Sequence, residues 1–333
     1  MTTIFLNKDA AYINRVFPDD VRRQICDLAD GRYETVLLDE LLNDPGQFAE
    51  VKYLFSTWGM PTLTEEQIRT CLPKLECVFY AAGSVQYFAR PFLDLGIKVF
   101  SAWMANAVPV AEYTVAQILL ANKGYYATSR MMSGGEAAPA KVLGRNYPGN
   151  YGTPVGILGI GAIGELVCEM LKPFNLKVLA YSRSLTEERA AALGAEKADI
   201  DTIFRTCQVV SNHIADNEKT KGIFGREQFA SMLPNATFLN TGRGAQVQED
   251  ALAEVLAQRP DLTAVLDVTF PEPPLPESPF YKLDNCVLTP HIAGSSGNEV
   301  HRMAQYMLEE FASHLKSEPC KYEVTIPMLE RMA

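Results

Sequence analysis

A single histidine stands inside the segment TPHIAG, residues 289–294, after a short apolar run and before a stretch with helical character. Histidine is the side chain whose charge changes near neutral pH, so His291 can serve as a general acid or base. The alternative is a core histidine whose ring nitrogens are merely hydrogen-bonded. Of the other histidines, His213 is expected to pack or to bond the backbone, and His301 and His314 are expected at the surface.

A glycine-rich segment, GIGAIG at residues 159–164, offers a second kind of chemistry. It follows an apolar run at 155–158, precedes a helical stretch, and lies about 20 residues before another strand-like run, which is the pattern of a dinucleotide-binding βαβ unit. The backbone N–H groups of such a turn and the start of its helix can hold a pyrophosphate. The alternative is a tight strand–helix turn without a ligand. The predicted contacts are Gly159, Gly161, Ala162, Ile163 and Gly164.

The residues after the second strand-like run of this unit decide which dinucleotide fits. Proteins that bind NAD usually place Asp or Glu there, where it accepts hydrogen bonds from the ribose hydroxyls. Here residues 181–184 read YSRS, without a carboxylate. Ser182 and Arg183 can bind a 2′-phosphate, because guanidinium groups pair well with phosphate. We therefore expect NADP(H), and NAD stays open because Glu187 and Glu188 follow closely.

The elements that must position these residues come in two series. Short β-branched or aromatic runs alternate with helical stretches, which predicts parallel sheets covered by helices. Thr64 is a plausible helix N-cap. The expected strands are 3–7, 34–39, 52–57, 77–82 and 98–102, then 155–161, 177–182, 208–213, 236–241, 263–268 and 286–289. The expected helices are 18–30, 64–72, 109–124 with Pro109 near its start, 187–194 and 299–318, and residues 131–154 are expected as a long excursion.

The composition limits the classes of partner. At 333 residues the chain is expected to form two domains. Its net charge of −10 disfavours nucleic acid and anionic membranes, and no window has the length of a membrane span. Seven scattered cysteines, never spaced as CxxC, predict reduced thiols in a cytoplasmic protein and no metal site.

Four motifs in this order and spacing resemble those of the D-2-hydroxyacid dehydrogenase family. They are GIGAIG (159–164), NTGRG (240–244), LDVTFPEPP (266–274) and TPHIAG (289–294). The resemblance covers nearly the whole chain and includes members of the glyoxylate and hydroxypyruvate reductase type. It implies an α/β fold with a Rossmann-type doubly wound parallel sheet and a second, flavodoxin-like α/β substrate domain.

The last helical stretch suggests how these two domains are divided along the chain. An amphipathic helix at 299–318 follows the second strand series and can return to the first domain. We therefore expect a discontinuous substrate domain, residues 1–104 and 300–333, around a dinucleotide-binding domain at 105–299.

The resemblance assigns three catalytic positions. His291 matches the family's general acid/base, and Glu272 matches the partner of that histidine. Arg243 matches the arginine that binds the substrate's carboxylate and keto oxygen. A guanidinium keeps its charge and matches both groups, so these residue types suit proton and charge transfer at a carbonyl.

The resemblance also assigns binding positions. Asp267 matches a residue that holds the nicotinamide carboxamide, and Thr241 belongs with the cofactor contacts. Ala82, Gly83 and Ser84 match a loop whose backbone N–H groups grip the substrate carboxylate.

The predicted function is NAD(P)-dependent interconversion of a small 2-keto acid and its D-2-hydroxy acid by hydride transfer. A catalytically weak, corepressor-like nucleotide-sensing scaffold on the same fold is the alternative. Formate dehydrogenase is disfavoured because that branch carries glutamine where Glu272 stands. The resemblance further implies a homodimer, for which the helix at 109–124 and the segment beyond it are candidate contacts.

Overall fold

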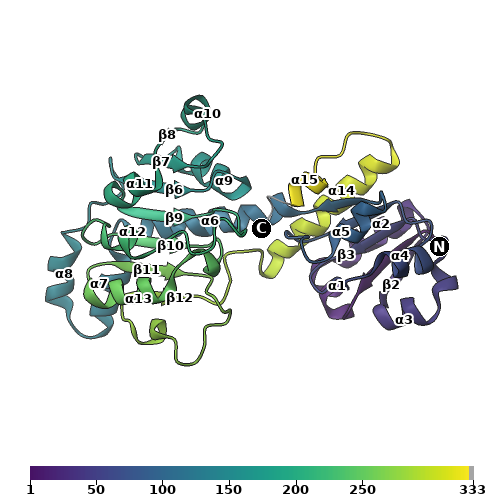
Figure 1. The fold of residues 1–333 in the computed structure, drawn as a ribbon, viewed down its shortest axis with the longest axis horizontal. Coiled ribbons are helices and arrows are strands. Elements are labelled where there is room, and N and C mark those ends of the chain that lie inside the picture. Colours follow the sequence, from purple (N-terminus) through teal and green to yellow (C-terminus); the bar gives the residue numbers. More distant parts are fainter. Residues whose placement is uncertain (330–333) are drawn as a thin grey trace. The chain divides into compact units, whose positions relative to one another are not determined.

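The computed structural model describes residues 1–329, and the chain divides into two compact units. Unit 1 comprises Met1–Ala107 and the residues from Ser295 onward, and unit 2 comprises Val108–Gly294. The chain leaves unit 1 inside a long helix and returns to it just before the last long helix (Figure 1). These divisions fall at 107/108 and 294/295, where the sequence led us to expect 104/105 and 299/300.

Unit 1 is built on a six-stranded sheet in the order β13-β5-β4-β3-β1-β2. All neighbouring pairs are parallel except β13 and β5, which are antiparallel. The order β2-β1-β3-β4-β5 is that of the flavodoxin-like fold, which agrees with the predicted class. The strands are β1 (Thr3–Asn7), β2 (Gly31–Leu37), β3 (Tyr53–Ser56), β4 (Cys77–Tyr80), β5 (Lys98–Ser101) and β13 (Glu323–Val324).

Helices from both ends of the chain cover this sheet. The C-terminal helix α14 packs against α1, α2, β4 and β5, so a segment distant in sequence completes the unit (Figure 1). The α-helices are α1 (Ala10–Val16), α2 (Asp19–Leu28), α3 (Leu38–Asn43), α4 (Glu65–Cys71), α5 (Ala89–Asp94), α14 (Val300–Leu315) and α15 (Ile326–Leu329).

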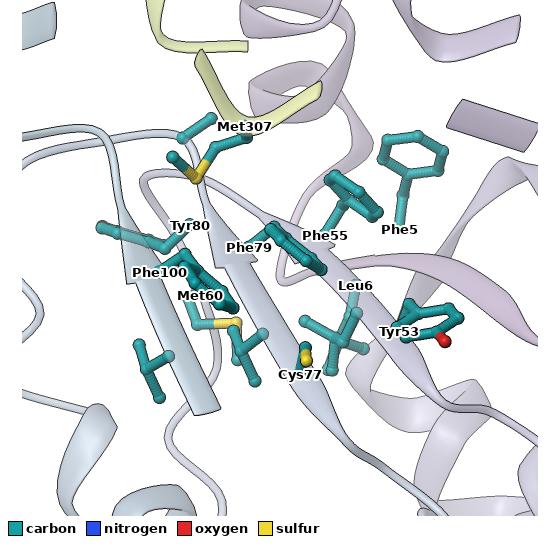
Figure 2. Packing of buried hydrophobic residues seen from close by; sticks show 14 of the residues in the cluster. Phe5, Leu6, Tyr53, Phe55, Met60, Cys77, Phe79, Tyr80, Phe100 and Met307 are labelled. Carbon is teal, nitrogen blue, oxygen red and sulfur yellow. The ribbon is translucent and has the colours of Figure 1, made fainter. Parts of the chain in front are cut away.

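A row of phenylalanine rings forms the centre of the unit 1 core. Phe5, Phe55, Phe79 and Phe100 are register partners on β1, β3, β4 and β5, and Figure 2 shows them beside one another. The rings of Phe55 and Phe79, and those of Phe79 and Phe100, stack with centroids 4.9 Å apart. Phe311 of α14 meets Phe55 and Phe79 edge-on, each at 5.2 Å. Burying each such ring contributes about 1.5–3 kcal/mol, so α14 is part of this core.

The expectation that His314 lies at the surface is wrong. Its ring is half-buried beside Tyr53 and Phe100, and Nε2 lies 3.3 Å from Sγ of Cys77. The residue falls on the buried side of α14 because its helix packs onto the sheet, which the helical pattern alone did not reveal.

Unit 2 is built on a seven-stranded sheet in the order β12-β11-β10-β9-β6-β7-β8, with every neighbouring pair parallel. Counted from β6, this is the 3-2-1-4-5-6 order of the doubly wound dinucleotide-binding fold, extended by one strand. The strands are β6 (Pro154–Leu158), β7 (Lys177–Tyr181), β8 (Ala195–Lys197), β9 (Val209–Asn212), β10 (Thr237–Asn240), β11 (Thr263–Leu266) and β12 (Cys286–Leu288).

The helices that begin unit 2 differ from the sequence expectation. Helix α6 spans Trp103–Ala121, so Pro109 lies inside it and not near its start. Within the expected excursion, α7 (Tyr125–Ser133) ends and α8 (Ala137–Gly144) forms, and the residues between the two helices and those beyond α8 are irregular. The remaining helices are α9 (Ala162–Leu171), α10 (Glu187–Ala192), α11 (Ile200–Thr206), α12 (Arg226–Ala230) and α13 (Glu249–Gln258).

Two further observations concern the residues that the structure describes. No helix among residues 1–329 is long and apolar enough to cross a membrane. All seven cysteines are free thiols.

Candidate active site

The glycine turn between β6 and α9 is built for close backbone approach. Gly159 has φ of +93°, and a Cβ there would lie 2.5 Å from the backbone of His213. A Cβ on Gly164 would collide with the carbonyl oxygen of Gly159. Gly161 caps α9 without a side-chain hydrogen bond, and a Cβ there would meet nothing within 4 Å. Two of the glycines therefore serve packing, and the third leaves open space at a helix N-terminus, which fits a dinucleotide pyrophosphate.

The end of β7 lies beside this turn. Gly159 N donates to Tyr181 O at 2.7 Å, and Leu158 and Tyr181 are register partners. Arg183 follows as an exposed side chain, with no ion-pair partner among residues 1–329. A guanidinium here can reach a phosphate without first breaking a salt bridge.

A histidine and a glutamate meet at the carboxyl ends of β11 and β12. His291 Nδ1 and Glu272 Oε1 lie 2.6 Å apart, and their side chains are 47% and 41% exposed, so the pair is accessible to a ligand. His291 has φ of +55°, a conformation that few non-glycine residues adopt. Its backbone N–H donates to Asp267 O and to Thr289 O, both at 3.0 Å. The tertiary structure therefore holds the turn in which His291 lies.

The buried carboxylate of Asp267 organises this turn. Asp267 is 2% exposed, and its oxygens accept hydrogen bonds from Thr289 Oγ1 at 2.6 Å, Ile292 N at 2.8 Å and Ala293 N at 2.9 Å. Three donors satisfy a buried charge that would otherwise be costly. The Asp267 carboxylate thus fixes the backbone that follows His291 and the side chain of Thr289 that precedes it.

Arg243 lies in the turn after β10. Its side chain is half-buried, and Nη1 donates to Gly242 O at 2.7 Å. The next residue, Gly244, packs directly on the backbone of Thr269, where a Cβ would collide. The Arg243 turn therefore lies against the start of the loop that carries Glu272.

A buried amide network, which the sequence analysis missed, supports the Arg243 turn. Asn212 Nδ2 donates to Asn240 Oδ1 at 3.0 Å and to Gln246 Oε1 at 2.6 Å, and all three residues are fully buried. Gln246 Oε1 also accepts from Arg243 N at 3.2 Å. The available signal was that two neighbouring parallel strands both end in asparagine, and Asn212 and Asn240 are register partners.

His213 is held by two hydroxyl groups. Nε2 lies 2.8 Å from Ser211 Oγ, and Nδ1 lies 3.2 Å from Thr241 Oγ1. Burial of the ring lowers the pKa of His213 to about 3. The ring is therefore neutral near pH 7. The hydroxyl of Thr241, a predicted cofactor contact, already forms a hydrogen bond with this ring.

The expected substrate loop belongs to unit 1 and follows β4. Ser101 Oγ lies 2.9 Å from Ala82 O and 2.6 Å from Gly83 O, and Ala82 N donates to Tyr80 O at 2.9 Å, so the N–H group of Ala82 is already engaged within the chain. Ala82 is buried, whereas Gly83 and Ser84 are half-buried.

The family model described as D-isomer specific 2-hydroxyacid dehydrogenase, NAD binding domain, matches residues 115–293, which contain the glycine turn, Arg243, Glu272 and His291. The chain belongs to this family. The match covers more than half of the chain and identifies unit 2 as the region that corresponds to the family's NAD-binding domain.

Curated relatives of this family member carry several names, among them D-3-phosphoglycerate dehydrogenase, glyoxylate reductase and formate dehydrogenase. A D-3-phosphoglycerate dehydrogenase of Archaeoglobus fulgidus is 32% identical over 71% of this chain and 44% of its own length. A glyoxylate reductase of Korarchaeum cryptofilum is 29% identical over 76% of this chain and 77% of its own length. The chain thus spans less than half of the first relative.

Solved structures share the fold. The apo form of D-mandelate dehydrogenase from Rhodotorula graminis superposes with a TM-score of 0.80 at 18% identity and covers 97% of each chain. The NAD-complexed D-isomer specific 2-hydroxyacid dehydrogenase of Lactobacillus delbrueckii superposes with a TM-score of 0.77 at 20% identity, over 98% of this chain and all of the other. At these identities the likeness establishes the two-domain fold alone.

Proposed function

We propose that this dehydrogenase-family chain interconverts a small 2-keto acid and its D-2-hydroxy acid with a nicotinamide dinucleotide. The observation that carries the proposal is the 2.6 Å contact between Nδ1 of His291 and Glu272, in the same unit as a glycine turn that suits a dinucleotide. The contact with Glu272 fixes the orientation of His291 as a proton donor, and the glycine turn provides a binding site for the dinucleotide.

The bound dinucleotide supplies the hydride that is exchanged with the carbon of the keto group. In the reductive direction, negative charge develops on the carbonyl oxygen, and His291 gives it a proton. Because Nδ1–H of His291 donates to Glu272, Nε2–H is the proton that the ring transfers. Arg243 binds the substrate carboxylate and stabilises the developing alkoxide with its permanent charge.

We also propose a carboxylate-binding role for backbone groups of unit 1. The N–H groups of Gly83 and Ser84 would hold the carboxylate, whereas the N–H group of Ala82 already donates to Tyr80 O. The contacts of the Ser101 hydroxyl with the carbonyls of Ala82 and Gly83 support this role because they fix the segment. A short 2-keto acid such as glyoxylate is the leading substrate, since the glyoxylate reductase relative matches over 77% of its own length.

NADPH is the proposed cofactor. Residues 182–186 carry no carboxylate, and the exposed Arg183 stands between Ser182 and Ser184 at the end of β7. An arginine with two neighbouring hydroxyls suits a 2′-phosphate, whereas an acidic residue there would repel it.

The experiment is a substrate panel with both cofactors. Purified protein is mixed with NADPH or NADH and with glyoxylate, hydroxypyruvate, pyruvate or phenylpyruvate, and D-3-phosphoglycerate is tested in the oxidative direction. We expect oxidation of NADPH with at least one short 2-keto acid. Nucleotide binding by calorimetry without turnover on any compound would favour a nucleotide-sensing scaffold, and formate oxidation would favour a formate dehydrogenase.

We also propose a homodimer that forms through unit 2. The helices at the start of this unit expose Tyr125, Met132 and Val142, each at least 50% exposed, and Tyr151 is 83% exposed. Large apolar side chains gathered on consecutive elements favour a protein contact, and a second copy of the chain is the proposed occupant.

A further inference from the structure

Glu272 lies in a loop that has little reason to be rigid by itself. The loop joins β11 to the turn at Pro279–Lys282, and the side chains of Phe270 and Leu275 within it are 67% and 51% exposed. A hydrogen bond of 2.6 Å between Glu272 and His291 nevertheless requires a fixed backbone, because small displacements of a catalytic group are costly. Thr269 Oγ1 and Tyr281 Oη donate to backbone carbonyls of this loop, and a side chain from outside the loop holds its start.

One side chain holds the backbone two residues before Glu272. Oε1 of Glu249 accepts a hydrogen bond from the backbone N–H of Phe270 at 2.8 Å. Glu249 is the first residue of α13, so its Cα is fixed by a helix that packs in the unit 2 core through Leu252, Val255 and Leu256. Pro271 and Pro273 flank Glu272, and their rings limit the backbone between the anchor and the carboxylate.

The environment of Glu249 differs from that of Asp250, the next residue in the same helical turn. Glu249 is half-buried, and burial raises the pKa of its carboxyl, whereas the hydrogen bond from Phe270 acts in the opposite direction. Asp250, the next residue, is exposed, and either carboxylate could serve the helix N-terminus electrostatically. Of these two carboxylates, only that of Glu249 accepts a hydrogen bond from the backbone of the Glu272 loop.

We propose that Glu249 is a positioning residue: by holding Phe270 N–H it orients the Glu272 loop and, through Glu272, the imidazole of His291. The inference rests on the proposed function for its effect on turnover, but the orientation of His291 can be measured without turnover.

The kinetic arm compares three variants. Glu249→Ala removes the acceptor, so kcat is expected to fall about ten- to a hundredfold with little change in the KM for the dinucleotide. Glu249→Gln keeps an acceptor oxygen and is expected to restore most of kcat. Asp250→Ala, the matched control, is expected to behave as wild type. A wild-type kcat for Glu249→Ala, or no rescue by Glu249→Gln, would overturn the proposal.

A double-mutant cycle tests whether Glu249 acts through Glu272. If it does, Glu249→Ala costs little more once Glu272→Ala is present, since the two residues form one unit. Fold-losses that multiply would show that Glu249 acts independently and would overturn the proposal.

The spectroscopic arm uses ¹⁵N-histidine-labelled protein, in which only four histidines contribute signals. The Nδ1–H resonance of His291 in its hydrogen bond to Glu272 is expected in wild type and Glu249→Gln, and it is expected to vanish in Glu249→Ala and Glu272→Ala. This pattern without any turnover would refute the proposed function and retain the positioning role. An unchanged resonance in Glu249→Ala would refute the positioning role, whatever the turnover.

Discussion

The two nitrogens of the His291 ring have different tasks in the proposed reaction. Glu272 engages Nδ1 at 2.6 Å, and Asp267 accepts hydrogen bonds from the backbone N–H groups of Ile292 and Ala293, which follow the ring. Nε2 is therefore the nitrogen that is presented to the substrate. Proton transfer by a positioned side chain usually accelerates a reaction about 10²–10⁴-fold.

The first prediction removes this proton donor. His291→Ala is expected to lower kcat about 10²–10⁴-fold while the dissociation constant of the dinucleotide stays close to wild type. His301→Ala, on α14 in unit 1, is the control and should leave both quantities unchanged. Steady-state kinetics with equilibrium dinucleotide titration measure the two; a loss of less than about tenfold in His291→Ala would contradict the acid/base role.

His213 gives a second prediction, on stability against pH. Burial depresses the pKa of His213 to about 3, below the usual 6.5 that applies in the unfolded chain. The unfolded chain therefore binds the extra proton first, so the stability due to neutral His213 is complete above about pH 6.5 and is lost as pH falls towards 3. His213→Gln should lose less unfolding free energy than wild type between neutral pH and about pH 4.

Denaturant unfolding at several pH values measures this difference, with His301→Gln as the control. Glutamine can still bond the hydroxyls of Ser211 and Thr241, so the comparison isolates the titration of the ring. Parallel pH curves for wild type and His213→Gln would contradict the prediction.

Arg183 carries the cofactor prediction. Arg183→Ala should weaken NADPH binding about tenfold or more and leave NADH binding nearly unchanged, because only NADPH offers a 2′-phosphate to the guanidinium. Arg189→Ala is the matched control, since Arg189 is already engaged by Glu165. Calorimetric titration with both dinucleotides decides the question, and equal losses for the two would remove the case for phosphate recognition.

At the level of elements, local chemistry predicted some boundaries well. Thr64 caps α4 in a reciprocal box with Gln67, as its sequence position led us to expect. Gly194 follows α10 with φ of +72°, which suits its predicted place at the helix end. These features depend on a few adjacent residues, so the sequence contains most of the information.

Other boundaries depend on tertiary packing. Helix α6 begins earlier than the position of Pro109 predicts, because buried Ala105 and Ala107 continue the helix before the proline. Helix α8 forms although it contains Pro139, because this proline lies in the first turn, where a missing N–H costs little. The Asn212–Asn240 pair likewise required knowledge of which strands are neighbours.

The glycine turn provides the element-scale prediction. Gly164→Ala should lower the unfolding free energy by about 1–3 kcal/mol, because the new methyl group collides with the carbonyl of Gly159. Gly161→Ala has open space and should leave the stability of the ligand-free protein unchanged, yet it should weaken dinucleotide binding. Thermal unfolding with and without dinucleotide distinguishes the effect on stability from the effect on binding. Similar behaviour of both variants would contradict the assignment of Gly164 to packing and of Gly161 to dinucleotide binding.

At the scale of the whole molecule, the two sheet types followed from alternating strands and helices together with four motifs. The strand orders are the flavodoxin-like and doubly wound ones. The sequence alone did not predict which apolar residues are exposed. Those on α7 and α8 could be identified only after the positions of these helices were known.

The last prediction concerns assembly. If unit 2 forms the homodimer contact, Val142→Glu should shift the protein to monomer, because a charge would be buried in an apolar interface. Leu28→Glu, at an exposed apolar position of unit 1, is the control and should leave the assembly unchanged. Sedimentation velocity measures the mass, and a monomeric wild type would contradict the proposed dimer.

The ring of Phe311 against Phe55 and Phe79 also bears on the order of events during translation. The ribosome synthesises the first 107 residues long before α14. Until α14 is made, the side of the phenylalanine row that Phe311 will cover is exposed to solvent. Unit 2 consists of the contiguous residues Val108–Gly294, so its folding requires no segment that is synthesised later. We therefore expect the nucleotide-binding half to mature first, while the earlier-synthesised half depends on chaperones or on completion of the polypeptide.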